Sequence, residues 1–152
     1  MPVDLDYLSP SAVEDAVALR ASRPSAAFLL GGTDLLPQMR SGRRSPETLI
    51  DLKRIPELCG IREDPDGGLT IGAAVPLADV GTDPLVRARF PLLAECAKSV
   101  GAWPLRQRAT LAGNVCNASP AADTAIALLA LDAVVNVAST TGRLAIAISE
   151  LF

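Results

Sequence analysis

Histidine is absent from the 152-residue chain, and aromatic residues make up only 3% of it. Without an imidazole, the chain has no histidine general base, no Ser-His-Asp triad and no His-ligated zinc. No stretch approaches the roughly 20 nearly uninterrupted apolar residues of a membrane-spanning helix, so we expect no membrane span. The 49% hydrophobic content nevertheless predicts a folded domain with a buried core.

Cysteine is scarce as well. Cys59, Cys96 and Cys116 form no Cys-x-x-Cys pair, which predicts neither a disulfide framework nor a local metal or iron–sulfur site. The net charge of −3 and the pI near 4.9 differ from those of a basic nucleic-acid binder. The first ten residues have neither the basic nor the apolar region of a secretory signal. We therefore expect a cytoplasmic protein that binds no nucleic acid.

The first fifty residues read as helix, strand, glycine turn, helix and strand. Ser11 and Glu14 have the spacing of a capping box for a helix over 11–21. The apolar run at 26–30 is typical of a strand buried on both faces, and 48–52 is the next strand. Together these elements predict a small αβαβ unit with a parallel sheet.

The remaining chain alternates turn signals with apolar runs. Asp83-Pro84 and Ser119-Pro120 each combine an N-cap with a proline at the first helical position. The predicted elements are, in order, a hairpin of 59–63 with 69–73, a helical turn over 77–80, one bent or two short helices over 84–100, an irregular stretch over 103–118, a helix ending at 131, and a hairpin of 134–137 with 144–148.

A glycine pair, Gly31-Gly32, ends the first strand and precedes a short helix over 34–40, for which Thr33 is the expected N-cap. Glycine lets the backbone approach a ligand closely, and free amides at a helix start favour phosphate oxygens. The pattern fits a bound pyrophosphate. A tight turn without any ligand fits these residues as well.

A second segment, 106–123, combines small residues with Thr110, Asn114 and Asn117, and its periodicity is weak. Backbone groups with few helix or sheet partners need other partners, which a bound polar ligand supplies. A surface loop of small residues is the alternative.

Four segments of the chain resemble those of a known family. They are Gly-Gly-Thr-Asp-Leu-Leu at 31–36, Ile50-Asp51-Leu52 with Ile-Pro-Glu-Leu at 55–58, Leu-Thr-Ile-Gly-Ala at 69–73, and the run from Arg108 to Asp123. In this order and spacing they resemble the FAD-binding medium subunit of the molybdenum hydroxylases. Xanthine dehydrogenase and aerobic carbon monoxide dehydrogenase belong to that family. The resemblance covers essentially the whole chain.

The resemblance implies an α+β, two-lobed FAD-binding fold of the vanillyl-alcohol-oxidase (PCMH) type. A small αβ N-terminal lobe would span 1–55, and a larger lobe over 56–152 would be incomplete, since family members continue into further strands and a C-terminal subdomain. FAD would lie between the lobes, with its pyrophosphate on backbone amides. Carried over by position, the cofactor-binding residues are Leu29, Leu30, Gly31, Gly32, Thr33, Asp34, Leu35, Thr110, Leu111, Ala112, Gly113, Asn114 and Asp123.

The implied function is electron transfer within a larger enzyme. A molybdopterin-binding large subunit would oxidise the substrate, a 2Fe-2S small subunit would carry the electrons, and FAD on this subunit would pass them to NAD+, oxygen or a quinone. No catalytic residue or metal ligand of this chain is implied. The alternatives are a truncated remnant or assembly domain that no longer holds FAD, and a nucleotide-binding module without redox function.

Other residues near these segments receive plainer interpretations. Arg106 and Arg108 are expected either to neutralise phosphate or to be exposed and solvated. Cys116 is expected to be a small buried side chain rather than a reactive thiolate, and Trp103 to pack in the core rather than against flavin.

Overall fold

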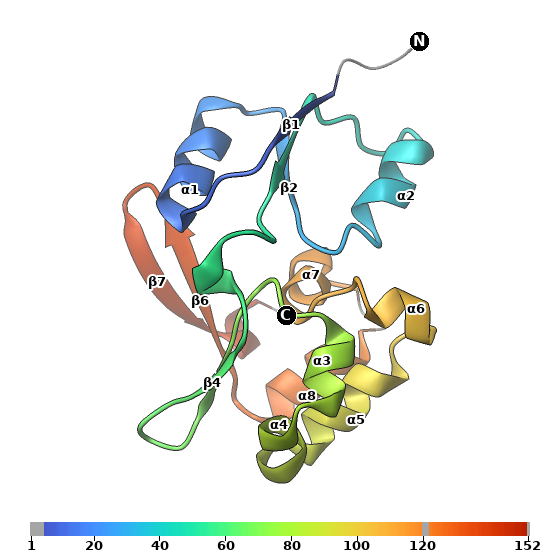
Figure 1. The fold of residues 1–152 in the computed structure, drawn as a ribbon, viewed down its shortest axis with the longest axis vertical. Coiled ribbons are helices and arrows are strands. Elements are labelled where there is room, and N and C mark those ends of the chain that lie inside the picture. The colour runs from blue at the N-terminus through green and yellow to red at the C-terminus, as the bar shows by residue number, and fades with distance from the viewer. Residues whose placement is uncertain (1–4, 120–121, 152) are drawn as a thin grey trace.

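The computed structural model describes residues 5–119 and 122–151. Its N-terminal part is a three-stranded parallel sheet with a helix on either side (Figure 1), which confirms the predicted parallel sheet and adds a first strand that the pattern did not reveal. The strand order is β1-β3-β2. The elements are β1 (Asp6–Leu8), α1 (Val13–Ser22), β2 (Ala26–Leu29), α2 (Leu35–Arg40) and β3 (Thr48–Asp51).

Separate clusters of buried side chains lie on the two faces of this sheet. Ala26 and Ile50 belong to the cluster that also contains Val13 of α1. Ala27 and Leu49 belong to a second cluster, against which residues of α2 pack. Alternate residues of each strand therefore bury their side chains under different helices, as the two-residue period of a strand requires. We call β1 to β3 with α1 and α2 the N-terminal lobe.

The strand at 26–30 departs from the expected burial at one position. β3 is buried throughout, whereas in β2 Phe28 is 41% exposed between buried neighbours. The expectation of full burial is thus wrong at Phe28, which lies on the edge strand β2 and lines a cleft described below.

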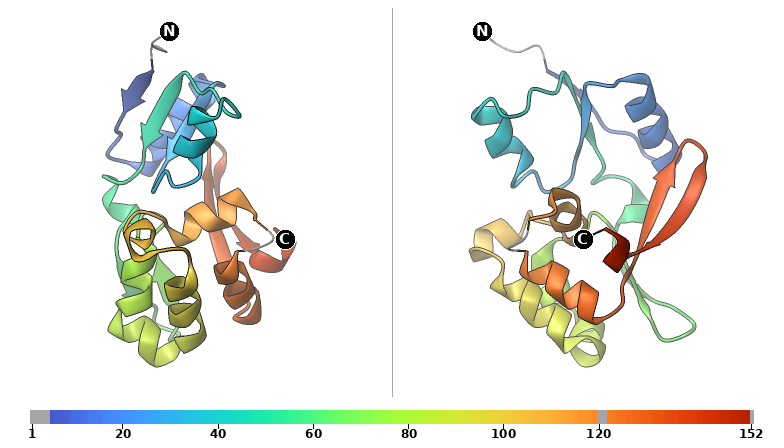
Figure 2. Two further views of the ribbon diagram at one scale, coloured as in Figure 1. Left: turned by 90° about the vertical axis from the view of Figure 1, so that its right-hand side faces the viewer. Right: turned by 180° about the vertical axis from the view of Figure 1, so that it is seen from behind.

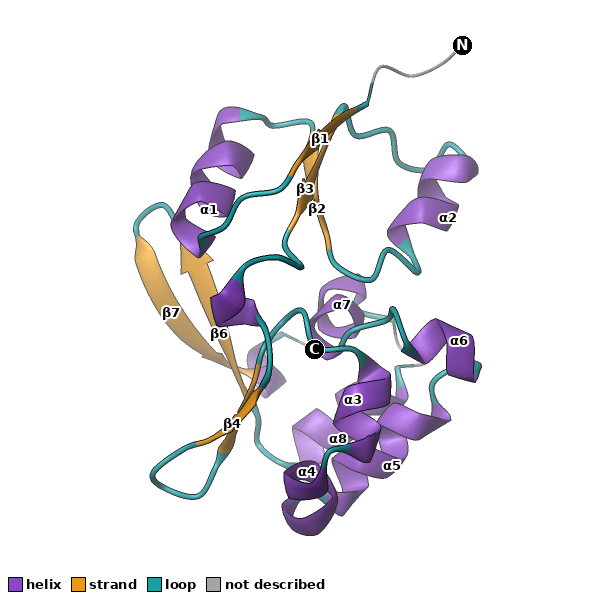
Figure 3. Ribbon diagram, viewed as in Figure 1, coloured by secondary structure: helices purple, strands orange, loops and turns teal. Residues whose placement is uncertain are grey.

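The second lobe is mainly helical, with two hairpins beside the helices (Figure 3). Its buried cluster centres on Leu77, Val80, Val86, Ala97 and Ala127. The elements are β4 (Ile61–Glu63), β5 (Leu69–Ile71), α3 (Leu77–Thr82), α4 (Pro84–Arg89), α5 (Pro91–Ser99), α6 (Trp103–Arg106), α7 (Leu111–Asn117), α8 (Asp123–Ala130), β6 (Val134–Ser139) and β7 (Gly142–Ala147), with 3-10 turns at Pro56–Leu58 and Ile148–Glu150.

The two hairpins and the paired helices of this lobe confirm the predicted pattern. β4 pairs with β5, and β6 pairs with β7, both antiparallel. Asp83 caps α4 through its carboxylate, which accepts hydrogen bonds from the Leu85 and Val86 amides at 2.8 and 3.1 Å. The β6–β7 hairpin extends away from the helices and lies beside α1 of the N-terminal lobe (Figure 2).

Three predicted helix caps are wrong. α1 begins at Val13 after an Ala12 N-cap that has no side-chain hydrogen bond, and Glu14 accepts a hydrogen bond from the distant Arg143 instead of closing a capping box with Ser11. α2 begins after Asp34 rather than Thr33, also without a side-chain cap. At α1 the long-range bond from Arg143 engages Glu14, and at α2 the backbone bond from the Leu36 amide to the Gly32 carbonyl at 3.0 Å forms the turn without a side-chain cap.

The third cap was predicted at Ser119-Pro120, but α8 begins at Asp123 with Ala122 as its N-cap, and Pro120 lies outside the described residues. The stretch over 103–118 is also not irregular, because it contains α6 and α7. Within residues 5–119 and 122–151, every helix falls short of the length and apolarity that crossing a bilayer requires.

The division of the chain after residue 55 stays a prediction. Ile55 is buried in the N-terminal cluster, and Leu58 and Ala138, which follow the predicted boundary, pack against the same cluster.

Candidate functional site

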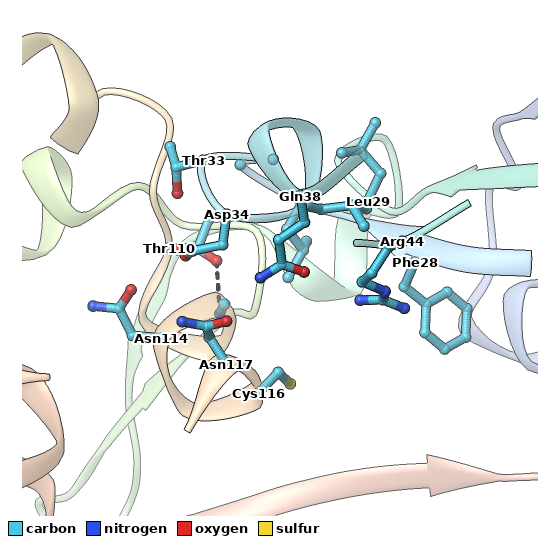
Figure 4. A pocket seen from close by; sticks show the side chains of 15 residues that line it. Phe28, Leu29, Thr33, Asp34, Gln38, Arg44, Thr110, Asn114, Cys116 and Asn117 are labelled. Atoms are coloured by element: carbon cyan, nitrogen blue, oxygen red, sulfur yellow. Dashed lines mark hydrogen bonds between the residues drawn. The ribbon is translucent and has the colours of Figure 1, made fainter. Parts of the chain in front are cut away.

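A cleft opens between the lobes, where the loop after β2 faces α7 (Figure 4). One wall comes from the end of β2, the glycine turn and α2, and the other from Thr110 and α7. The lining residues are Phe28, Leu29, Leu30, Gly31, Gly32, Thr33, Asp34, Leu35, Gln38, Arg44, Thr110, Gly113, Asn114, Cys116 and Asn117. Two segments that are remote in sequence therefore form one site.

Most of the predicted cofactor-binding residues line this cleft, and three do not. Leu111 is buried in the core of the second lobe and Ala112 is half-buried outside the lining. Asp123 lies at the start of α8, where its carboxylate accepts a hydrogen bond from the Ser99 hydroxyl at 2.8 Å. Contact with FAD stays a prediction for every residue of the set.

Gly31 stands where the two lobes touch. A Cβ atom at this position would overlap the carbonyl oxygen of Arg108 and would lie 2.6 Å from its carbonyl carbon. Distances this short do not occur between non-bonded atoms, so only glycine lets these two backbones approach. The missing Cβ of Gly31 therefore serves the contact between lobes, whereas the sequence suggested that it served a ligand.

Gly32 has a different reason to be glycine. Its φ of +71° lies in the left-handed region, which side-chain-bearing residues avoid. A Cβ here would also lie 3.0 Å from the Leu29 side chain and 3.1 Å from that of Leu36. Gly32 thus turns the chain from β2 toward α2.

The second signature satisfies its own backbone through a short helix. The Thr110 hydroxyl accepts a hydrogen bond from the Gly113 amide at 3.0 Å and caps α7 (dashed in Figure 4). Thr110 also forms an isolated bridge with Pro76, beside the bond from the Leu77 amide to the Ala109 carbonyl at 2.8 Å. The expectation that these residues have few helix partners is therefore wrong over Leu111–Asn117, whereas the binding of a ligand by this segment stays a prediction.

Asn114 connects the cleft to the core of the second lobe. Its side-chain amide donates a hydrogen bond to the hydroxyl of Thr124 at 3.1 Å, and Thr124 is fully buried on α8. This bond fixes α7 against α8, so Asn114 has a structural partner as well as a place in the lining.

A buried carboxylate holds the glycine loop from the side of the N-terminal lobe. Asp51, at the end of β3, accepts hydrogen bonds from Tyr7 and from the Lys53 amide and ammonium group. Lys53 also donates to the Leu30 carbonyl at 3.3 Å, next to the glycine pair. Burial raises the pKa of Asp51, but the hydrogen bonds from Lys53 and Tyr7 outweigh it, and the net pKa is lowered.

Five lining residues lie outside the predicted cofactor-binding set: Phe28, Gln38 and Arg44, which the sequence analysis did not consider, and Cys116 and Asn117, which belong to its second segment. An aromatic side chain within the apolar run before the glycine pair was a usable signal for Phe28. Nothing local pointed to Arg44, which enters the cleft from the loop after α2. Cys116 is exposed rather than buried, and the desolvation of its thiol by neighbouring atoms raises its pKa, which disfavours a reactive thiolate.

The remaining candidates lie elsewhere. Arg106 donates to the carbonyls of Val100 and Gly101 at 3.1 and 2.9 Å, and so secures the end of α5. Arg108 is exposed and contributes its backbone to the contact with Gly31. Trp103 is 65% exposed on α6, outside the cleft lining, so the expected core packing is wrong.

The composition of the cleft suits a neutral or anionic polar ligand. Small side chains, hydroxyls and carboxamides dominate the lining, and its charged members are Asp34 and Arg44. Among the described lining residues, Thr33, Thr110 and Cys116 carry hydroxyl or thiol groups, and neither lysine nor histidine is present.

Comparison with known proteins identifies the fold and the cofactor. Residues 3–152 match the profile of the FAD binding domain in molybdopterin dehydrogenase. The carbon monoxide dehydrogenase medium chain of Hydrogenophaga pseudoflava is 41% identical over 134 residues, which are 88% of this chain and 46% of that protein. The Escherichia coli K12 protein named "Putative xanthine dehydrogenase FAD-binding subunit XdhB" is 34% identical over 136 residues, which are 90% of this chain and 47% of that protein.

Solved structures agree with these sequence matches. A carbon monoxide dehydrogenase from Hydrogenophaga pseudoflava that lacks the Mo-pyranopterin moiety superposes with a TM-score of 0.92 at 37% identity, over 98% of this chain and 52% of that one. Quinoline 2-oxidoreductase from Pseudomonas putida 86 superposes with a TM-score of 0.91 at 28% identity, over 95% of this chain and 50% of that one.

The chain spans about half the length of the curated relatives it matches. Within that half, the α+β fold and the two signatures agree with the resemblance seen in the sequence. FAD is the cofactor, and the chain belongs to the family of FAD-binding domains of molybdopterin dehydrogenases.

Proposed function

We propose that this chain supplies the part of an FAD site that holds the pyrophosphate, and that electrons reach an acceptor through that FAD. The observation that carries the proposal is the meeting of residues 29–35 with Thr110, Gly113 and Asn114 in one cleft. FAD, when bound, supplies the redox chemistry, and the protein binds and orients it.

The residues present fit such a cofactor. Gly31 and Gly32 both line the cleft, so the glycine turn contributes main chain to its wall. The hydroxyl of Thr33 and the carboxamide of Asn117 line the same cleft and can bind sugar or phosphate oxygens. The lining thus offers both main chain and polar side chains to a cofactor.

We further propose that the acceptor is NAD+, oxygen or a quinone, and that the electrons come from 2Fe-2S clusters in a small subunit beside a molybdopterin-binding large subunit. The support is the family description and the medium-chain relatives, which are named as parts of multisubunit dehydrogenases. The three free cysteines fit a reducing compartment, which supports a cytoplasmic location.

The direct test is a flavin titration. We expect the purified chain to bind FAD, with quenching of flavin fluorescence and a changed visible spectrum, either alone or together with a polypeptide that supplies the other half of its relatives. Failure to bind FAD under both conditions would overturn the proposal and favour a remnant that no longer holds the cofactor. Binding of ADP without any flavin binding would favour a nucleotide-binding module.

Asn114→Ala tests the cleft itself. We expect it to weaken FAD binding by about 1 to 3 kcal/mol, because a buried polar contact is lost. Thr124→Val is the matched control, since it removes the same Asn114–Thr124 hydrogen bond from the side that does not line the cleft. Equal losses of FAD affinity in the two variants would show that Asn114 acts only by fixing α7 against α8.

A further inference from the structure

Arg44 is the only cation among the described residues that line the cleft. Its guanidinium makes no hydrogen bond or ion pair with any described residue, whereas other arginines, such as Arg89 and Arg143, are paired with carboxylates. An arginine without a partner at a polar cleft is available to an anionic ligand.

The backbone holds Arg44 at this position. The amides of Arg43 and Arg44 both donate to the carbonyl of Gln38 in α2, at 2.9 and 3.3 Å. Gln38 itself lines the cleft. The loop after α2 is thereby folded back over the end of that helix, which brings Arg44 to the lining while Arg43 stays outside it.

Phe28 occupies the same end of the cleft. In Figure 4 the Phe28 ring and the Arg44 guanidinium lie toward one end, and Thr33, Asp34 and Thr110 lie toward the other. The cleft therefore has an aromatic and cationic end and a carboxylate and hydroxyl end. The Asp34 carboxylate repels phosphate, so the charge distribution favours a diphosphate displaced toward Arg44.

We propose that Arg44 and Phe28 form the adenosine-diphosphate end of the FAD site, with Arg44 binding the diphosphate and Phe28 providing an apolar face for the adenine. The inference rests on the proposed function and adds to it two residues outside the predicted signatures and an orientation of the cofactor. The planar guanidinium presents paired donors to phosphate oxygens, and an aromatic face stacks on any base.

The test compares Arg44→Gln with Arg43→Gln, which makes the same charge change one residue away and outside the lining. Dissociation constants are measured for FAD, for ADP and for riboflavin, which has the flavin ring but no phosphate. We expect Arg44→Gln to weaken FAD and ADP about tenfold at low salt, the size of one charge-assisted contact, and to leave riboflavin unchanged. Arg43→Gln stays within about twofold of the parent for all three ligands.

Salt and a second variant sharpen the result. The loss in Arg44→Gln shrinks as ionic strength rises, because Arg44 is exposed and screened. Phe28→Leu weakens ADP and FAD but leaves inorganic pyrophosphate unchanged.

Unchanged FAD affinity in Arg44→Gln, or an equal loss in Arg43→Gln, would overturn the inference and leave the proposed function standing. If the parent chain bound no FAD at all, either alone or together with a polypeptide that supplies the other half of its relatives, the inference and the proposed function would both fall.

Discussion

The N-terminal lobe meets the second lobe at Gly31, where main chain touches the main chain of Arg108, and at Glu14, which forms an exposed ion pair with Arg143. Arg143 on β7 binds Glu57 in the turn after β3 and Glu14 on α1, the latter at 2.9 Å. The first contact leaves no room for an added atom. The second consists of long side chains that can rearrange and that water and salt screen.

This difference shows where the chain needs a fixed geometry. The Gly31 contact forms part of the cleft wall, and none of the three ion-paired residues lines the cleft. A misplacement at Gly31 moves the candidate cofactor site directly, whereas a misplacement at Arg143 changes only how the hairpin lies on α1. We therefore expect the two contacts to respond very differently to mutation.

Gly31→Ala should have the largest effect. The new Cβ overlaps the Arg108 carbonyl, so the lobes have to separate or the turn has to distort, at a cost of about 3 kcal/mol. Denaturant unfolding measures the stability, and FAD titration measures the site. We expect both stability and FAD binding to fall.

Gly42→Ala provides the control for this variant. Gly42 has a φ of +72°, in the left-handed region that Gly31 does not occupy, and no atom lies within 4 Å of its missing Cβ. It should cost about 1 kcal/mol, the price of the left-handed backbone alone. If Gly31→Ala were no more destabilising than Gly42→Ala, the contact between Gly31 and Arg108 would tolerate an added atom and would not be rigid.

Asp51→Asn should have an intermediate effect, because Asp51 supports the loop that carries Gly31. Its side chain is 5% exposed and loses charge-assisted hydrogen bonds from Lys53 and Tyr7, which amounts to about 2 kcal/mol at neutral pH. Unfolding at pH 7 with Tyr7→Phe alongside, which removes one donor only, separates the contributions of the two partners.

The pH dependence gives this prediction a second measurement. A carboxyl whose pKa is lowered by folding stabilises the native state fully above its unfolded pKa, near 3.9, and this stabilisation is lost as the pH falls through the folded pKa. The difference between the parent chain and Asp51→Asn should therefore shrink below about pH 4. A difference that does not change with pH would contradict a role for the ionised form.

Arg143→Gln should have the smallest effect. The hydrogen bonds from Arg143 lower the pKa values of Glu14 and Glu57, so their contribution is present above the ordinary glutamate range and disappears in acid. We expect a lower melting temperature at low salt, a smaller decrease than for Gly31→Ala, and no difference at high salt. FAD affinity should stay unchanged, and a loss of FAD binding would make the ion pairs part of the site.

Elements with local signals could be predicted from the sequence. The hairpins and the Asp83 cap depend on turn residues and on bonds within three positions, and the structure contains them. The capping box failed because Glu14 is bound by a residue 129 positions away. No local pattern contains that information.

The missed helix α7 has a related cause. Its sequence includes Gly113, Asn114, Val115 and Asn117, all weaker helix formers than alanine, and propensity alone predicts a loop. The Thr110 cap and the Asn114–Thr124 bond stabilise it from outside the segment. Tertiary contacts override the local preference here.

In the candidate site too, residues with a local sequence signal could be predicted, and residues placed by tertiary contacts could not. The glycine loop was visible because its residue types are unusual, and its neighbours do line the cleft. Arg44 was not visible, because its position depends on how the chain returns over α2 through the Gln38 carbonyl. Phe28 was assigned to a buried strand because the sequence cannot show that this strand lies at an edge.

In the contact between Gly31 and Arg108, Arg108 contributes only backbone atoms, which every amino acid has. Every residue type has a backbone carbonyl and can stand at position 108, whereas alanine or any larger residue at position 31 would overlap that carbonyl. A saturation mutagenesis map should therefore show an intolerant position touching a permissive one. Statistical methods that infer proximity from pairs of positions changing in concert will find no coupling there, although the two backbones are in direct contact.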